Sequence, residues 1–113
     1  MKIGDVKHIK VAKKYSTALI SAAIEENKPE KVYQDLIFID ETIKTNEQLS
    51  VFLDNPVIKN IDKIDTVKKL FSVHTDKISL DFIVMLIENG RLNIIDEVLN
   101  QFAAAYNKYK NIL

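Results

Sequence analysis

Apolar residues recur at helical spacing along most of this chain, and short polar segments separate one run from the next. Alternation of apolar and polar residues, the pattern of half-buried strands, is not sustained anywhere. Two prolines and two glycines leave few positions for the tight turns of a β-fold. The pattern predicts an all-α protein, a six-helix bundle. With 113 residues the chain can enclose one core but not two, so we expect residues 1–113 to form a single helical domain.

The first predicted helix, from about Asp5 to Glu26, has a wider apolar arc than one core contact requires. Its large aliphatic residues form one flank of the helical wheel, and a second flank of smaller residues lies beside it. Together they cover about twice the ~100° that suffices in a two-layer bundle. Something must therefore cover the surplus apolar surface. The second flank consists of Val11, Tyr15, Ala18 and Ala22.

The segment from Ile78 to Arg91 is the most apolar stretch, and we expect the rest of the bundle to be organised around it. On a helical wheel, only Asp81 and Glu88 clearly mark a side that faces water. At roughly a dozen residues the segment is too short to span a bilayer, so other helices must enclose it. Asn89-Gly90 then ends the helix, because glycine tolerates the left-handed conformation of a helix C-terminus.

The second and third helices have recognisable start and stop signals. Pro29 is suited to the first position of a helix that extends to about Lys44. Thr45 and Gln48 have the spacing of a capping box that would open a short third helix. Pro56 then enforces a stop.

The fourth and sixth helices are defined by their apolar stripes. A fourth helix from about Lys59 to Ser72 places Ile61, Ile64, Val67, Lys68 and Phe71 along one side, with Leu70 beside them. The sixth and longest helix begins near Arg91. Its stripe runs to the last residue without a cap, which predicts that the natural chain continues. The stripe comprises Leu92, Ile95, Leu99, Phe102, Tyr106, Tyr109 and Leu113.

Charge and composition exclude several classes of protein. Apolar residues make up 47% and charged residues 28%, as in ordinary folded proteins. The 16 basic and 16 acidic residues cancel, which argues against a nucleic-acid-binding surface. Without cysteine the chain has no disulfide or thiolate chemistry. Since residues 1–10 resemble neither a signal nor a transit peptide, we expect a cytoplasmic location.

Residues that could carry chemistry are sparse and scattered. His8 and His74 are far apart and fit no zinc motif, so both are expected to be solvated. There is no glycine-rich phosphate loop and no nucleophile elbow. Asp62 and Asp65 alternate with lysines, which indicates a salted surface and disfavours nucleic-acid or membrane binding by those lysines. We therefore expect no catalytic residue, no cofactor site and no metal site.

Several short motifs, in one order, resemble the delta subunit of bacterial F-type ATP synthase, a relative of the mitochondrial oligomycin-sensitivity-conferring protein. The motifs are VAKKYSTAL at 11–19, Asn-Pro at 55–56, LIENGRL at 86–92 and VLNQF at 98–102. Ser16 stands where the family usually has alanine. The family also has a further C-terminal region with no counterpart here, so the resemblance implies the N-terminal domain of such a subunit.

The resemblance implies a non-catalytic role in the stator of the synthase. In the family, this six-helix domain sits on the crown of the catalytic head and binds the N-terminal helix of an alpha subunit in a groove between its first and fifth helices. The C-terminal region holds the b subunit of the peripheral stalk. The protein would lie on the cytoplasmic face of the bacterial plasma membrane without inserting. The groove residues would be Val11, Tyr15, Ala18, Ala22, Ile78, Phe82 and Met85.

Other interpretations stay open at this point. Small residues such as Ala18 and Ala22 also occur where two helices of one bundle pack closely, and Met85 is also suited to filling a core. A free-standing helical adaptor that binds another amphipathic helix would share every feature except the motif order. A helix-turn-helix regulator is a more distant alternative.

Overall fold

The predicted six helices are confirmed in a computed structural model, which describes the backbone of residues 3–112 and the side chains of residues 8–111. A single 3-10 turn, Leu92–Ile94, precedes the last helix, and the described residues contain no strand. The α-helices are α1 (Ile3–Glu25), α2 (Pro29–Thr45), α3 (Glu47–Asp54), α4 (Asn60–Phe71), α5 (Lys77–Glu88) and α6 (Ile95–Ile112).

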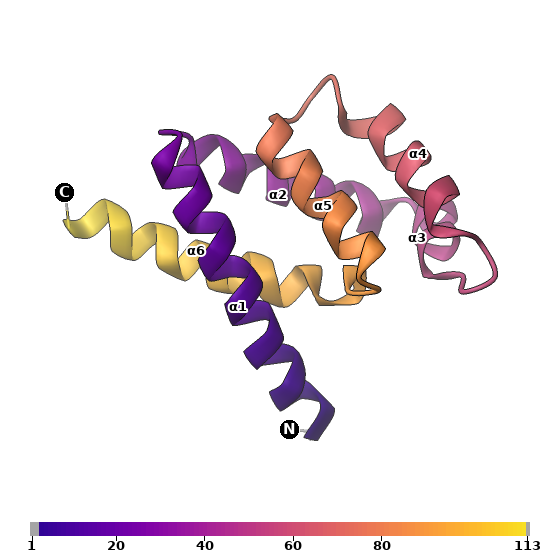
Figure 1. Ribbon diagram of the computed structural model, residues 1–113, viewed down its shortest axis with the longest axis horizontal. Helices are drawn as coiled ribbons and strands as arrows, with labels where there is room; N and C mark the ends of the chain where they lie inside the picture. The colour runs from indigo at the N-terminus through magenta and orange to yellow at the C-terminus, as the bar shows by residue number, and fades with distance from the viewer. Residues whose placement is uncertain (1–2, 113) are drawn as a thin grey trace.

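Helices α1 and α5 lie across α6 and α2, while α3 and α4 pack at one end of the molecule (Figure 1). Helix α5 is enclosed on its buried side by α1, α2 and α4. The most extensive interfaces, however, join α6 to α1 and to α2. The expectation that α5 organises the bundle is therefore wrong. Helix α6 is also not the longest, since it has 18 residues and α1 has 23.

The core is a continuous cluster of aliphatic and aromatic side chains drawn from the six helices. Each large side chain that is fully buried contributes about 1.5–3 kcal/mol to folding. The largest of these include Phe71 of α4, Phe102 of α6, Leu36 and Ile39 of α2, and Ile83 and Leu86 of α5.

The apolar stripe of α6 is confirmed over the described side chains. Phe102 and Tyr106 are buried against the ring of Tyr33 from α2, with centroid distances of 6.1 and 5.4 Å. Tyr109 is half-buried at the end of the stripe. Leu113 lies outside the described residues.

The residue that caps the start of α3 is not the predicted Thr45. The hydroxyl of Thr45 donates a hydrogen bond of 2.7 Å to the Glu41 carbonyl, so Thr45 still belongs to α2. The cap of α3 is Asn46, whose side-chain oxygen accepts a 3.1 Å hydrogen bond from the backbone N–H of Leu49. Asn46 can act as the N-cap because its backbone is extended, as this position of a helix requires.

The predicted end of α5 at Asn89-Gly90 is confirmed. Asp76 caps its start, where the carboxylate accepts a 3.0 Å hydrogen bond from the backbone N–H of Ile78. Gly90 follows its end with a φ of +66°, the left-handed conformation that favours glycine.

The predicted buried face of α4 is partly wrong. Ile61 is 71% exposed and Leu70 is 45% exposed, whereas Lys63 is buried at 8%. Lys63 lies one turn before the fully buried Val67, so the buried face is rotated away from Ile61. A lysine tolerates this position because its aliphatic stem packs against apolar surface.

Candidate functional site

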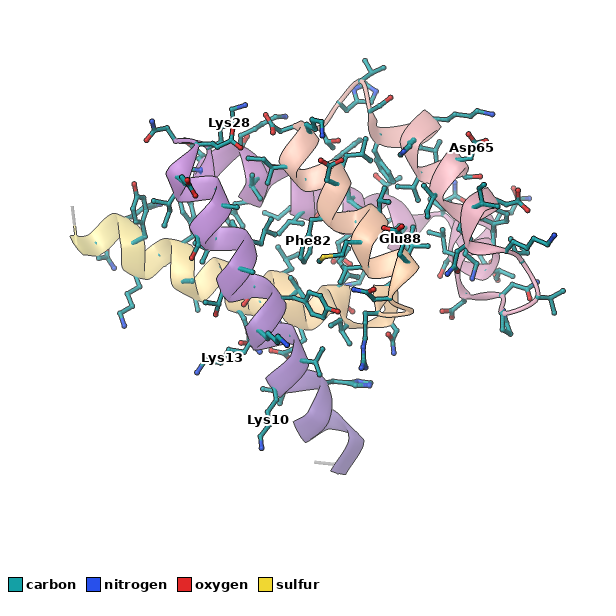
Figure 2. All side chains as sticks on the ribbon, in the orientation of Figure 1. Lys10, Lys13, Lys28, Asp65, Phe82 and Glu88 are labelled. Atoms are coloured by element: carbon teal, nitrogen blue, oxygen red, sulfur yellow. The ribbon has the colours of Figure 1, made fainter. Side chains whose placement is uncertain are left out.

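Helices α1 and α5 lie side by side and run in opposite directions (Figure 1). The ring of Tyr15 from α1 meets the ring of Phe82 from α5 edge to face, with centroids 6.3 Å apart and planes at 73°. The side-chain amide of Asn89 donates a 3.1 Å hydrogen bond to the Tyr15 hydroxyl. Figure 2 shows Phe82 between the two helices. These contacts place the end of α5 beside the middle of α1.

The start of α5 is joined to the turn between α1 and α2 by an ion pair. The Lys28 ammonium lies 2.9 Å from the carboxylate of Asp76. The backbone N–H of Ile78 and then the hydrogen bond from Lys28 lower the pKa of Asp76. The same hydrogen bond, which Lys28 donates to Asp76, raises the pKa of Lys28. The end of α5 is thus attached to the middle of α1, and the start of α5 is attached to the turn between α1 and α2.

A buried carboxylate also holds the start of α5 against α2. Asp35 is only 2% exposed, and its Oδ2 accepts hydrogen bonds from the Ser79 hydroxyl at 2.7 Å and from the Asp76 backbone N–H at 2.8 Å. Lys31 pairs with its other oxygen at 2.8 Å. The burial of Asp35 was not predicted from the sequence. Its position within the stripe of Val32, Leu36 and Ile39 was the available signal.

The structure brings the predicted groove residues to one side of the α1 and α5 pair. Ala18 and Ala22 are exposed on α1, and Val11 and Tyr15 on the same helix are half-buried. On α5, Ile78 and Met85 are half-buried, whereas Phe82 is 6% exposed and belongs to the core. We name this surface the α1/α5 face, and its residues are Val11, Tyr15, Ala18, Ala22, Ile78, Phe82 and Met85.

The exposure of two alanines decides between the interpretations of this flank. Had Ala18 and Ala22 mediated close packing within the bundle, both would be buried by a neighbouring helix. Both are exposed instead, while Ala12 and Ala23 on the neighbouring flank are fully buried at 0%. The α1/α5 face therefore remains open at its α1 side.

The opposite side of α5 faces the core. Ile83 and Ile87 are buried, and Leu80 is half-buried against the core. Asp81 and Glu88 are exposed, in agreement with the prediction that they mark the side of α5 that faces water. The predicted water-facing stripe of α5 is thus confirmed, whereas Phe82, expected in the groove, is buried in the core.

Among the side chains of residues 8–111, no group of three or more metal-ligating residues lies close together. A surface hollow of about 420 Å³ lies beside α3 and is lined by Val51, Phe52 and Ile58 together with polar residues. Within residues 3–112, no helix is long and apolar enough to cross a membrane.

The arrangement defines the class of small all-α bundles in which two adjacent antiparallel helices present an open apolar face. Comparison with known proteins specifies the family. The chain belongs to the ATP synthase delta (OSCP) subunit family, which matches residues 11–113. The resemblance inferred from the short motifs is thereby confirmed.

Individual relatives support the same family. The chain is 32% identical over 102 residues to the chloroplastic ATP synthase subunit delta of Galdieria sulphuraria, covering 90% of this chain and 58% of the relative. It is 31% identical over 103 residues to the delta subunit of Christiangramia forsetii, covering 91% and 55%. The sodium ion specific delta subunit of Ilyobacter tartaricus is 30% identical over 96 residues, covering 85% and 55%. The chain thus spans little more than half the length of these relatives.

Proposed function

We propose that this chain acts in the stator of an ATP synthase by binding the N-terminal helix of an alpha subunit on the α1/α5 face. The observation that carries the proposal is the exposure of Ala18 and Ala22 beside half-buried apolar residues of α5. Membership in the delta subunit family supplies the context in which this face would act. The role is mechanical and non-catalytic, since the contact would keep the catalytic head from turning with the rotor.

The chemistry of the α1/α5 face suits an amphipathic helix. Ala18 and Ala22 have small side chains, so a second helix can approach the α1 backbone closely. Met85 adapts its shape to the incoming side chains, and Tyr15 offers a large ring with a polar tip. Five or six apolar side chains buried at about 1.5–3 kcal/mol each would exceed the cost of ordering one short helix.

The remaining parts of the assignment follow from the family and stay predictions. A C-terminal region would hold the b subunit of the peripheral stalk. The assembled protein would lie at the cytoplasmic face of the bacterial plasma membrane, bound to the synthase and not inserted in the lipid. The single-domain character of residues 1–113 also stays a prediction.

Calorimetric titration with a peptide tests the proposal directly. The peptide comprises the first twenty or so residues of the alpha subunit from the same organism, and a scrambled peptide is the control. We expect saturable one-to-one binding with a negative heat-capacity change, because apolar surface is buried. If the alpha peptide produces no heat with the folded protein while another amphipathic helix binds, the adaptor interpretation replaces this one.

A substitution on the open flank gives the sharper test. Ala18→Asp places a charge on the α1/α5 face without disturbing the core, because Ala18 is exposed. We expect at least a tenfold loss of affinity, equivalent to about 1.4 kcal/mol, with unchanged helicity. Ala104→Asp is the matched control, since Ala104 is exposed on α6, a helix that contributes no residue to this face. Equal binding by both variants would contradict the proposed site.

A further inference from the structure

The α1/α5 face has a charged border on each of its helices. On α1, the exposed Lys14 lies one helical turn from both Val11 and Ala18. On α5, the exposed Glu88 lies one turn after Met85. A helix resting on the apolar residues would therefore pass between a basic side chain and an acidic one.

Lys14 and Glu88 lie at the same level of the face. Lys14 precedes Tyr15, and Glu88 precedes Asn89, whose amide is bonded to the Tyr15 hydroxyl at 3.1 Å. Among the side chains of residues 8–111, no ion pair involves Lys14 or Glu88. Both charges are thus available to a partner.

The far end of the face has the reverse arrangement of signs. There the α1 border ends in the exposed Glu25, and α5 begins with Lys77. Lys77 is already paired with Asp81 at 2.7 Å, which raises the pKa of Lys77, and Glu26 adds a smaller contribution. The Lys77 charge is thus compensated within α5, and the two borders present opposite, uncompensated charges at the end where Lys14 and Glu88 lie.

We propose that the helix bound on the α1/α5 face has borders of opposite charge, with an acidic side chain facing Lys14 and a basic side chain facing Glu88. The inference rests on the proposed function, because it specifies the partner of that same face. A helix with two basic borders would be repelled by Lys14, and one with two acidic borders would be repelled by Glu88. Charge complementarity of this kind selects among partners more than it adds affinity.

Three designed peptides test the inference on the 113-residue chain. They share one stripe of leucine, isoleucine and valine and differ only in the residues that flank it in one half of the helix. The flanks are glutamate on one side and lysine on the other, glutamate on both sides, or lysine on both sides. We expect the mixed peptide to bind about threefold or more tightly than either uniform peptide at low ionic strength. High salt should reduce this difference.

Variants of the two border residues should change the preferred peptide. With Lys14→Glu both borders become acidic at this level, so the peptide with two lysine flanks should bind best. With Glu88→Lys both become basic, and the peptide with two glutamate flanks should bind best. Lys13→Glu makes the same charge change as Lys14→Glu, but Figure 2 shows Lys13 on the side of α1 that faces away from α5. The control should leave the order of the peptides unchanged.

The failures of the two proposals are distinguishable. Equal binding of the three peptides, or a preference of the unmodified protein for a uniform peptide, overturns the opposite-border inference and leaves the α1/α5 face as a binding site. The same reordering with Lys13→Glu also overturns it, because net charge would then explain the result. Binding of none of the designed peptides overturns it as well, while titration with the alpha peptide decides the proposed function separately.

Discussion

Asp35 illustrates how one buried carboxylate can attach two helices that are distant in the sequence. One carboxylate oxygen accepts hydrogen bonds from the Ser79 hydroxyl and the Asp76 backbone N–H, and the other forms an ion pair with the Lys31 ammonium. The negative charge of Asp35 is thus compensated by these three partners. A carboxylate buried in this way is stable only while each of these partners remains in place. It therefore couples the first turn of α5 to the middle of α2.

Asp35→Ala should be strongly destabilising for its size. The substitution leaves the buried Ser79 hydroxyl and the Asp76 N–H without their acceptor, and we expect the free energy of unfolding to fall by about 2–4 kcal/mol. Urea denaturation measures this loss. Asp54→Ala serves as the control, because Asp54 is exposed at the end of α3 and should change stability by less than about 0.5 kcal/mol.

At the residue scale, the sequence predicted apolar positions better than buried polar ones. The open flank with Ala18 and Ala22 followed from helical phase alone, because an apolar residue outside the core face needs another cover. The burial of Asp35 and Lys63 did not follow, because it depends on partners and packing surfaces contributed by other helices. A pattern along one helix contains no information about those partners.

The ends of α5 show what local sequence determines at the scale of an element. Asp76 accepts the backbone N–H that opens the helix, and Gly90 adopts the left-handed conformation that follows its close. Both devices act within a few residues and can therefore be recognised before the tertiary structure is known. The capping box at Thr45 was misassigned by one position, because Asn46 can accept the same type of bond.

Gly90→Ala should destabilise the protein by about 1 kcal/mol. A methyl group at Gly90 would have no neighbour within 4 Å, so the cost arises from its φ of +66° and not from a steric clash. Thermal and chemical denaturation measure the change. Gly90→Asn should cost less, because asparagine tolerates this conformation better than alanine does. Equal losses from both substitutions would show that the backbone conformation is not the cause.

At the scale of the whole molecule, the sequence predicted the set of helices but not their relative importance. A helical wheel shows how much of the circumference of a helix is apolar. Because this fraction is largest for α5, we expected α5 at the centre of the bundle. Which helix crosses the most neighbours depends on packing angles between helices. Helix α6, with an ordinary apolar stripe, makes the most extensive interfaces because both α1 and α2 lie against it.

The interface between α2 and α6 should make stability depend on pH. Lys44 lies 3.1 Å from Asp40 of α2 and 2.7 Å from Asp96 of α6. Burial and then the nearby Asp96 raise the pKa of Asp40 above its usual 3.8. Burial opposes ionisation of Asp96 too, but hydrogen bonds involving Lys44 and Asp40 lower its pKa.

The sign of the effect follows from proton binding. Between 3.8 and the raised pKa, the folded protein binds more protons at Asp40 than the unfolded chain does. The stabilisation due to Asp40 is thus complete below pH 3.8 and is lost as the pH rises through the folded-state pKa. In Asp40→Asn this loss should be absent. Urea denaturation across this pH range measures it, and identical pH profiles for the two proteins would contradict the assignment.

The attachment of α5 to α2 through Asp35 has a mechanical consequence. A partner seated on the α1/α5 face of a stator would exert shear on α5 whenever the rotor turns. Because Asp35 connects the start of α5 to the neighbouring helix, sliding of α5 along its axis requires the buried polar joint to break together with the apolar packing. A force applied to α5 would therefore be transmitted to α2 through Asp35, and the two helices would resist it together.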